Sequence, residues 1–265
     1  MAVISYLGLS FWSILVIFSL MNVTRENRSI FIDIDNIMRI LDLFSGTESV
    51  KRTVKKYPQF CDWEVVSLDL AQADICCNIL DWDYEKEFSP RDFDVVWASP
   101  PCTCFSRLKR CNLGRQCKNG KVFTPESIED DIQTIGLPLL NRTFEIIDYF
   151  QPDHWFVENP ATARTKDYIH DKPFYVVDYC QYGMPYRKRT NIWTNLKSFE
   201  PLLCDKNCSG WDGKKHAVKV NELGGGSDST INGKRAVRSK VPEELIRSLF
   251  MGVMREKSLN GIRPH

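Results

Sequence analysis

The chain of 265 residues carries 35 Lys and Arg against 34 Asp and Glu, a formal net charge of +1. This balance excludes an overall field that would attract a polyanion, so any nucleic-acid surface has to be a local basic patch. With 43% hydrophobic residues, the chain can form one α/β domain with a small appendage. Ten cysteines at irregular spacings favour reduced thiols over a disulfide framework.

Residues 1–37 differ from the rest of the chain. The run VISYLGLSFWSILVIFSLM (3–21) has no charged residue and is just long enough to cross a bilayer, but it lacks the flanks of a secretory signal. Three interpretations stay open: a dispensable leader or extended reading frame, a membrane anchor, or a core-packing helix. Arg25 and Arg28 follow the run, so an inserted segment would leave the domain on the cytoplasmic side. We expect the protein in the cytoplasm or nucleus of a host cell.

From Met38 onward, short apolar runs alternate with stretches of helical spacing. This alternation predicts an α/β domain over 38–200 with a mostly parallel sheet and helices on both faces. Residues 201–265 form a small C-terminal region, which closes with an amphipathic helix at 241–254. The predicted strands are 39–44, 64–70, 94–99, 154–159, 174–180 and 190–195, and the predicted helices before the C-terminal region lie within 47–57 and 127–150.

Ligands of such sheets bind outside the carboxyl ends of the strands, so the residues there are the candidates for a site. The first strand runs through Asp42 into Phe-Ser-Gly-Thr (44–47), where a glycine turn lets backbone N–H groups approach a ligand. The second strand ends at Asp69, 27 positions after Asp42. A carboxylate at that separation is typical of a group that holds ribose hydroxyls, although a strand-capping Asp is the alternative.

The strand at 94–99 leads into Ser-Pro-Pro-Cys, which presents Cys102 on a rigid platform. A cysteine is more often a buried thiol, but polar, Pro-rich surroundings argue against that here. The strand at 154–159 ends in Glu158-Asn159, so its carboxylate should emerge beside the thiol. Arg187 and Arg189 precede the last strand and can aim guanidinium groups into the same crevice.

The order of these motifs resembles the cytosine-C5 DNA methyltransferase family, closest to its short forms in bacteriophages and large DNA viruses. The resemblance covers roughly residues 38–200 and rests on LDLFSG, the Asp-ended second strand, PPC followed by Phe-Ser, ENP and the paired arginines. It implies a Rossmann-like S-adenosylmethionine-dependent methyltransferase fold, S-adenosylmethionine as cofactor and DNA as substrate, with no obligate protein partner. An RNA (tRNA) cytosine methyltransferase and a nucleic-acid-binding pseudoenzyme stay open as alternatives.

The resemblance also implies catalytic roles. Cys102 would add to C6 of the cytosine ring, Glu158 would hold or protonate N3, and Asn159 would orient the loop. Arg187 and Arg189 would support the base and Glu158. The ring carbons cannot be reached inside a duplex, so a duplex substrate needs its base flipped out.

The cofactor site implied by the resemblance lies at the ends of the first strands. Glu48 stands where many family members have a second glycine of the turn, and Asn78 replaces an acidic residue that often accepts the adenine amino group. The implied cofactor-binding residues are Asp42, Phe44, Ser45, Gly46, Thr47, Asp69, Asn78, Ser99 and Pro100.

The segment after Cys102 is basic from residue 107 to 121 and contains no acidic residue. A solvated loop is the ordinary interpretation, but its position resembles the mobile loop that closes over nucleic acid in this family. We predict Cys104 to be a packed or loop thiol. The predicted DNA-binding residues are Ser106, Arg107, Lys109, Arg110 and Arg115.

The C-terminal region is too short for a full target-recognition domain. It contains Cys204, Cys208 and His216, whose spacing suits part of a zinc site. Because a structural zinc normally needs four ligands, we predict no metal, with this partial zinc site as the alternative.

Overall fold

The computed structural model describes residues 37–116, 120, 122–220 and 238–261. Met38–His265 form one compact unit. The apolar run at 3–21 lies outside the described residues, so its three interpretations stay predictions. Within the described ranges, none of the helices combines the length and the apolar character needed to cross a bilayer.

A seven-stranded sheet organises the unit, with strand order β3-β2-β1-β4-β5-β7-β6. The neighbours from β3 to β5 are parallel, and β7 runs antiparallel to both β5 and β6. The predicted Rossmann-like, mostly parallel sheet is therefore confirmed. The strands are β1 (Arg39–Leu43), β2 (Glu64–Asp69), β3 (Ile75–Cys76), β4 (Val95–Ala98), β5 (His154–Pro160), β6 (Phe174–Asp178) and β7 (Arg189–Thr194).

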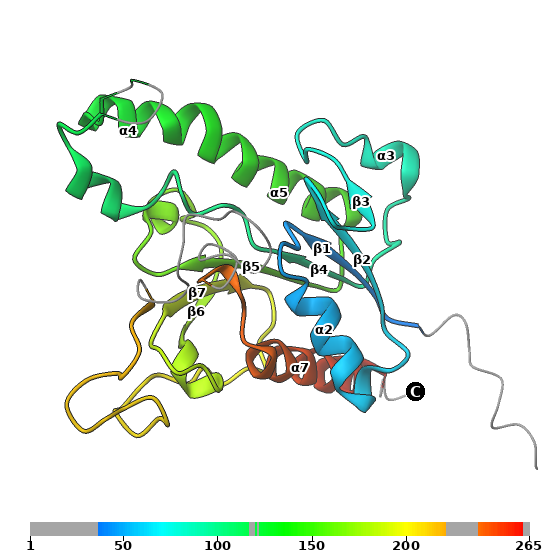
Figure 1. Cartoon of the computed structure of the whole chain (residues 1–265). Coiled ribbons are helices and arrows are strands. Elements are labelled where there is room, and N and C mark those ends of the chain that lie inside the picture. The colour runs from blue at the N-terminus through cyan, green and yellow to red at the C-terminus, as the bar shows by residue number, and fades with distance from the viewer. Residues whose placement is uncertain (1–36, 117–119, 121, 221–237, 262–265) are drawn as a thin grey trace, which may run out of the picture. The chain divides into compact units, whose positions relative to one another are not determined.

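Helices cover both faces of the sheet (Figure 1). On one face lie α2 (Ser49–Lys56) and α7 (Glu243–Gly261), and on the other lies α5 (Leu137–Phe150). The predicted helix within 127–150 is interrupted: α4 (Pro125–Asp131) passes through a π-helical turn, η5 (Ile132–Gly136), because Pro138 cannot donate a backbone hydrogen bond at the start of α5. The remaining short helices are η3 (Pro58–Phe60), α3 (Tyr84–Glu87), η4 (Arg107–Asn112), η6 (Arg164–Asp167) and η7 (Tyr179–Tyr182).

The central strand β4 divides its side chains between two cores. Val95 and Trp97 belong to the core under α2 and α7, whereas Val96 and Ala98 belong to the core under α5. This division follows from the period of two in a strand. A strand buried on both faces reads as a continuous apolar run, which is why VVWA was recognisable in the sequence.

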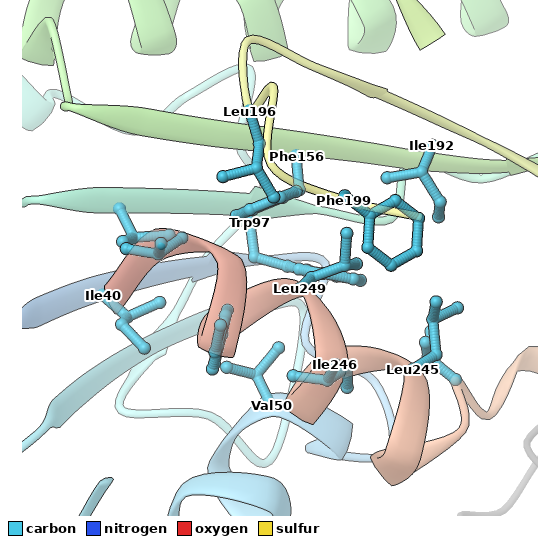
Figure 2. Close-up of a cluster of buried hydrophobic side chains, with 14 of the residues drawn as sticks. Ile40, Val50, Trp97, Phe156, Ile192, Leu196, Phe199, Leu245, Ile246 and Leu249 are labelled. Atoms are coloured by element: carbon cyan, nitrogen blue, oxygen red, sulfur yellow. The ribbon is translucent and has the colours of Figure 1, made fainter. Parts of the chain in front are cut away.

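Helix α7 is part of the core of this unit although it comes from the C-terminal region. Leu245, Ile246 and Leu249 are fully buried against the sheet, where they meet side chains from the strands (Figure 2). The strand residues include Ile40 and Trp97. The last described helix of the chain therefore completes one of the two cores.

We predict that Leu249→Ala lowers the free energy of unfolding by about 2–5 kcal/mol, because it leaves a cavity in a fully packed core. Leu259→Ala on the same helix is the matched control, since Leu259 is 68% exposed; it should change stability by less than about 0.5 kcal/mol. Urea denaturation of both variants measures the difference. Equal losses would contradict the placement of α7 in the core.

Candidate active site

The carboxyl ends of β1, β2, β4 and β5 meet at one edge of the sheet. Leu43 is paired with Leu68 on one side and Ala98 on the other, and Ala98 is paired with Val157. The ladder continues past the strand ends, because Ser99 N–H donates to the Leu43 carbonyl at 3.2 Å. The predicted cofactor turn, the Pro-Pro loop and Glu158 therefore follow adjacent strand ends.

Asn159 ties the loop that carries Cys102 to strand β5. Its side-chain amide donates to the carbonyl of Pro100 at 2.8 Å and its oxygen accepts a hydrogen bond from Thr165 Oγ1 at 2.7 Å. Asn159 is only 1% exposed, so both hydrogen bonds are shielded from water. This is the contact that the expected loop-orienting role requires, and it places Cys102, which is half-buried, two residues beyond the anchor.

The far side of the Cys102 loop is held by the same segment of the chain. Arg164 N–H donates to the Phe105 carbonyl at 2.8 Å, and Ser106 forms a β-bridge with Ala163. Cys104, which lies within this loop, has a buried side chain, and burial raises the pKa of its thiol. Cys104 is thus the packed thiol that we predicted.

Glu158 is buried at the bottom of this edge, with 5% of its surface exposed. Its Oε1 accepts a hydrogen bond from the Tyr179 hydroxyl at 2.8 Å and lies 3.4 Å from Lys188 Nζ. Tyr179 is fully buried and comes from η7, while Lys188 directly precedes β7. Two residues that lie 21 and 30 positions after Glu158 thus fix the orientation of its carboxylate.

The expected contact of Arg187 and Arg189 with Glu158 is corrected by the structure. Both guanidinium groups bind Asp178, with Nε–Oδ1 distances of 3.1 Å. Successive residues of an extended chain point to opposite sides. Lys188, between the two arginines, therefore faces Glu158 while they face away from it. In the sequence, the two arginines were the expected partners of Glu158, and no sequence pattern indicated that role for Lys188.

Asp178 holds this second cluster. Burial acts to raise its pKa, but hydrogen bonds from Arg189, the Cys204 amide and Arg187 lower it overall. The ion pair to Arg189 measures 2.9 Å and Asp178 itself is fully buried. The arginines thus fix the β6–β7 edge, next to the site and not in its centre.

The turn after β1 has an unusual backbone. Phe44, Gly46 and Glu48 have φ values of 59°, 48° and 52°, in the left-handed region. Side chains other than glycine are disfavoured there by about 1 kcal/mol or more, and such conformations cluster at ligand sites. A glycine at position 48 would adopt this backbone conformation without that cost.

Two buried polar atoms beside this turn lack a protein partner among the described residues. They are Asp42 Oδ2 and Ser45 Oγ. Burial, followed by the nearby carboxylates of Asp69 and Glu48, raises the pKa of Asp42 well above its ordinary value. Buried polar groups are nearly always satisfied in proteins, so a pair of unsatisfied ones marks a place for a polar ligand.

Asp69, Asn78 and Thr47, which are also expected to bind the cofactor, each have hydrogen-bond partners within the protein. Asp69 accepts hydrogen bonds from Gly46 N–H at 2.9 Å and Leu70 N–H at 2.7 Å. The side-chain oxygen of Asn78 accepts from Leu80 N–H at 3.2 Å. Thr47 Oγ1 lies 3.2 Å from Ser49 Oγ. Asp69 is at the same edge as the turn, and these roles remain predictions.

The basic segment divides into exposed and paired cations. Arg107, Arg110 and Arg115 are exposed, as a phosphate contact requires. Lys109 instead lies half-buried with its Nζ 2.7 Å from Asp131 Oδ2. This ion pair already balances its charge, so the expected contribution of Lys109 to nucleic-acid binding has no support in the structure. Ser106 is half-buried at its bridge with Ala163.

A viral protein is similar over most of the chain. A protein of Frog virus 3 (isolate Goorha), described as "Probable DNA (cytosine-5)-methyltransferase", is 44% identical over 222 residues, which cover 80% of this chain and 99% of the relative. No family model matches the sequence.

Two solved structures show weaker likeness. The Entamoeba histolytica methyltransferase EhMeth has a TM-score of 0.44 and 11% identity, over 72% of this chain and 61% of that one. The S. pombe Dnmt2 methyltransferase has a TM-score of 0.35 and 12% identity, over 62% and 52% of the two chains. Because both scores are below 0.5, the family assignment rests on the viral relative.

We predict that replacing Asp42 by Asn makes the protein more stable, by an amount that depends on pH. The folded-state pKa of Asp42 is raised, so the folded protein binds this proton more tightly than the unfolded chain does. The resulting destabilisation is absent below the unfolded pKa of about 3.9 and grows as the pH rises toward the folded pKa. Asp42→Asn should therefore unfold at higher urea concentration than the wild type at pH 7, by about 1 kcal/mol or more, with the gain shrinking toward pH 4.

Asp74→Asn is the control of opposite sign. Burial acts to raise its pKa, but hydrogen bonds from Lys51 and Ser67 bring the pKa of Asp74 down to about 2. Its stabilising effect is present above the unfolded pKa and is lost as the pH falls toward 2. Asp74→Asn should lose stability at pH 7. A gain in stability for Asp74→Asn at pH 7, or a loss for Asp42→Asn, would contradict the opposite pKa shifts of these two carboxyl groups.

Proposed function

The chain belongs to the DNA (cytosine-5)-methyltransferase family, and from that premise we propose that it methylates C5 of cytosine in DNA through a covalent bond to Cys102. One observation carries this assignment beyond family membership. The buried hydrogen bond from Asn159 to Pro100 fixes the loop of Cys102 to the strand that carries Glu158. A thiol and a carboxylate are thereby attached to the same strand end.

We propose S-adenosylmethionine as the methyl donor, because the chemistry of the first strand ends suits it. Asp42 Oδ2 and Ser45 Oγ are buried polar atoms without a partner among the described residues, and they lie beside the left-handed turn, so a polar ligand there would satisfy them. Asp69 ends β2, where a carboxylate can bind ribose hydroxyls. When bound, the cofactor supplies an electrophilic methyl group.

Cys102 is proposed to act first as nucleophile and last as leaving group. Its sulfur bonds to C6 of the ring, and the C5–C6 π electrons become available at C5. After C5 has been methylated, loss of the C5 proton expels the sulfur and restores the aromatic ring. The Pro-Pro segment and the Asn159 anchor hold the sulfur in place, since attack requires a separation of about 3–3.5 Å.

Glu158 is proposed to hold N3 of the cytosine, which makes C6 electrophilic. The Tyr179 hydroxyl and Lys188 Nζ both act on its Oε1. Oε2 is therefore the atom that we assign to N3. Two donors on one oxygen keep the carboxyl group in a single orientation, so that no reorganisation is needed when the base enters.

DNA is the proposed substrate because the viral relative is described as acting on it. A cytosine in a duplex has to be flipped out to reach Cys102, which costs a few kcal/mol of unstacking. We propose that the arginines of the loop after Cys102, which are exposed, bind the phosphates on either side of the flipped base. Their contribution should weaken as salt is raised.

We predict that Cys102→Ser abolishes methyl transfer, by a factor of about a thousand or more, because an alcohol is a much weaker nucleophile than a thiolate. The measurement is transfer of tritiated methyl groups to DNA, with tRNA as a second substrate. DNA containing 5-fluorocytosine should trap wild-type enzyme covalently, since fluorine at C5 cannot leave as a proton does. Cys111→Ser is the control, because Cys111 is an exposed cysteine of the same loop.

Three results would contradict the assignment. Cys102→Ser could retain activity, the wild type could fail to form the trapped adduct, or label could appear in tRNA alone. The last result would favour the RNA methyltransferase.

Lys188→Met should lower kcat by about tenfold or more, because it removes one of the two groups that orient Glu158. Arg187→Met removes a charge one residue away that contacts Asp178 and not Glu158. It should change kcat less than about threefold, even where it lowers stability. A larger kcat loss in Arg187→Met than in Lys188→Met would show that the arginines, and not the lysine, act at the reacting base.

A further inference from the structure

A cluster of four metal-ligand groups lies outside the candidate active site. Cys180, Cys204, Cys208 and His216 each direct one ligand atom to a common centre, and these atoms all lie within 4.8 Å of one another. Cys180 belongs to η7, directly after β6, and the other three come from the segment 201–220 that follows β7. The sequence suggested three of the four, and the fold supplies the fourth.

The separations among Cys204, Cys208 and His216 match a tetrahedral zinc site, and the Cys180 sulfur lies within 4.8 Å of all three. Bonds of about 2.3 Å to sulfur and 2.0–2.1 Å to nitrogen place two sulfurs about 3.8 Å apart and a sulfur and nitrogen about 3.6 Å apart. The observed distances are 3.9 Å for Cys204 Sγ to Cys208 Sγ, 3.5 Å for Cys204 Sγ to His216 Nε2, and 3.3 Å for Cys208 Sγ to His216 Nε2. A disulfide, by contrast, requires a sulfur separation of about 2.05 Å.

The backbone around the cluster is shaped to present these ligands. Trp211 N–H donates to the Cys208 carbonyl at 3.0 Å, and Trp211 forms a β-bridge with His216. Lys206 adopts a left-handed conformation with φ of 75° and directs its backbone amide to the Cys204 sulfur. Backbone amides that donate to thiolates are a common outer shell of metal–cysteine sites.

The segment also fits closely against the protein at one point. Gly210 is buried, and a Cβ there would lie 2.6 Å from the carbonyl oxygen of Pro185. Few other side chains of 201–220 are buried, and Leu202 and Leu203 remain 48% and 50% exposed. A segment that buries so little apolar surface needs another source of order.

We propose that Cys180, Cys204, Cys208 and His216 bind one zinc ion in a closed structural site. Four protein ligands leave no open coordination position, so the ion holds the chain together and takes no part in methyl transfer. Three thiolates and one imidazole at tetrahedral spacing favour zinc over hard cations such as Mg²⁺ or Ca²⁺. The site joins the segment 201–220 to the turn after β6.

The proposed site shares a contact with the cluster around Asp178. Cys204 N–H donates to Asp178 Oδ2 at 2.9 Å, and Cys180 follows Asp178 by two residues. Asp178 also binds Arg187 and Arg189, on either side of Lys188. Zinc would therefore stabilise the edge of the sheet that positions Lys188, at a distance from the reacting groups.

The test is the zinc content of the full chain, purified without chelator and measured by mass spectrometry of the metal. The wild type should hold about one zinc per chain. Cys180→Ser and Cys208→Ser should each lose most of it, whereas Cys61→Ser and Cys111→Ser, which change exposed cysteines, should keep it. Cobalt-loaded wild type should show the visible absorption of a tetrahedral thiolate site, and this should disappear in Cys180→Ser.

A second measurement avoids dependence on whether the variants fold. Modification of wild-type thiols with a mercurial should release about one zinc per chain to a chromogenic chelator. Removal of zinc should make 201–220 the first segment cleaved in limited proteolysis. Wild type that binds no zinc when supplied with it, a Cys180→Ser variant with full zinc content, or a Cys204–Cys208 disulfide in protein kept under reducing conditions would overturn the proposal. None of these readouts depends on methyl transfer, so either proposal can fail alone.

Discussion

The buried hydrogen bonds of Asn159 are the constraint on which the candidate active site depends. One amide group bridges the Pro100 carbonyl and the Thr165 hydroxyl where water cannot compete. A broken bond here would leave buried polar groups unsatisfied, which costs more than such a bond contributes in water-exposed positions. The loop of Cys102 and the strand of Glu158 therefore keep one relative position.

Strand alternation decides which cation serves Glu158. The three consecutive basic residues that lead into β7 offer guanidinium groups on one side and an ammonium group on the other. The register of β7 between β5 and β6 places the ammonium group toward Glu158. A shift of one residue would exchange these roles. The buried carboxylate of Asp178 accepts hydrogen bonds from both arginines that the register turns away, and it balances one of their two positive charges.

Much of the fold was predictable because β1, β2, β4 and β5 are each a short apolar run followed by turn residues, a pattern that indicates a strand from the local sequence alone. Strand β3 was missed, since a two-residue strand has no period to detect. The adjacency of the strand ends that carry Cys102 and Glu158 was predictable from the rule that parallel strands end at one edge. Lys188 and Cys180 were not predictable, because one depends on register and the other on a contact between segments 24 or more residues apart. Such long-range geometry has no local trace in a sequence.

The position of helix α7 in the core also has a consequence for folding during synthesis on the ribosome. The helix supplies Leu245, Ile246 and Leu249 to a core that also contains Ile40 of β1, so the first strand and the last described helix close the same face. During synthesis that face of the sheet stays open until residues 245–249 have left the ribosome. Nascent chains and products of premature termination thus expose a broad apolar surface, which chaperones and proteases recognise. A fragment that ends before α7 would leave Ile40 and Trp97 without the helix that covers them.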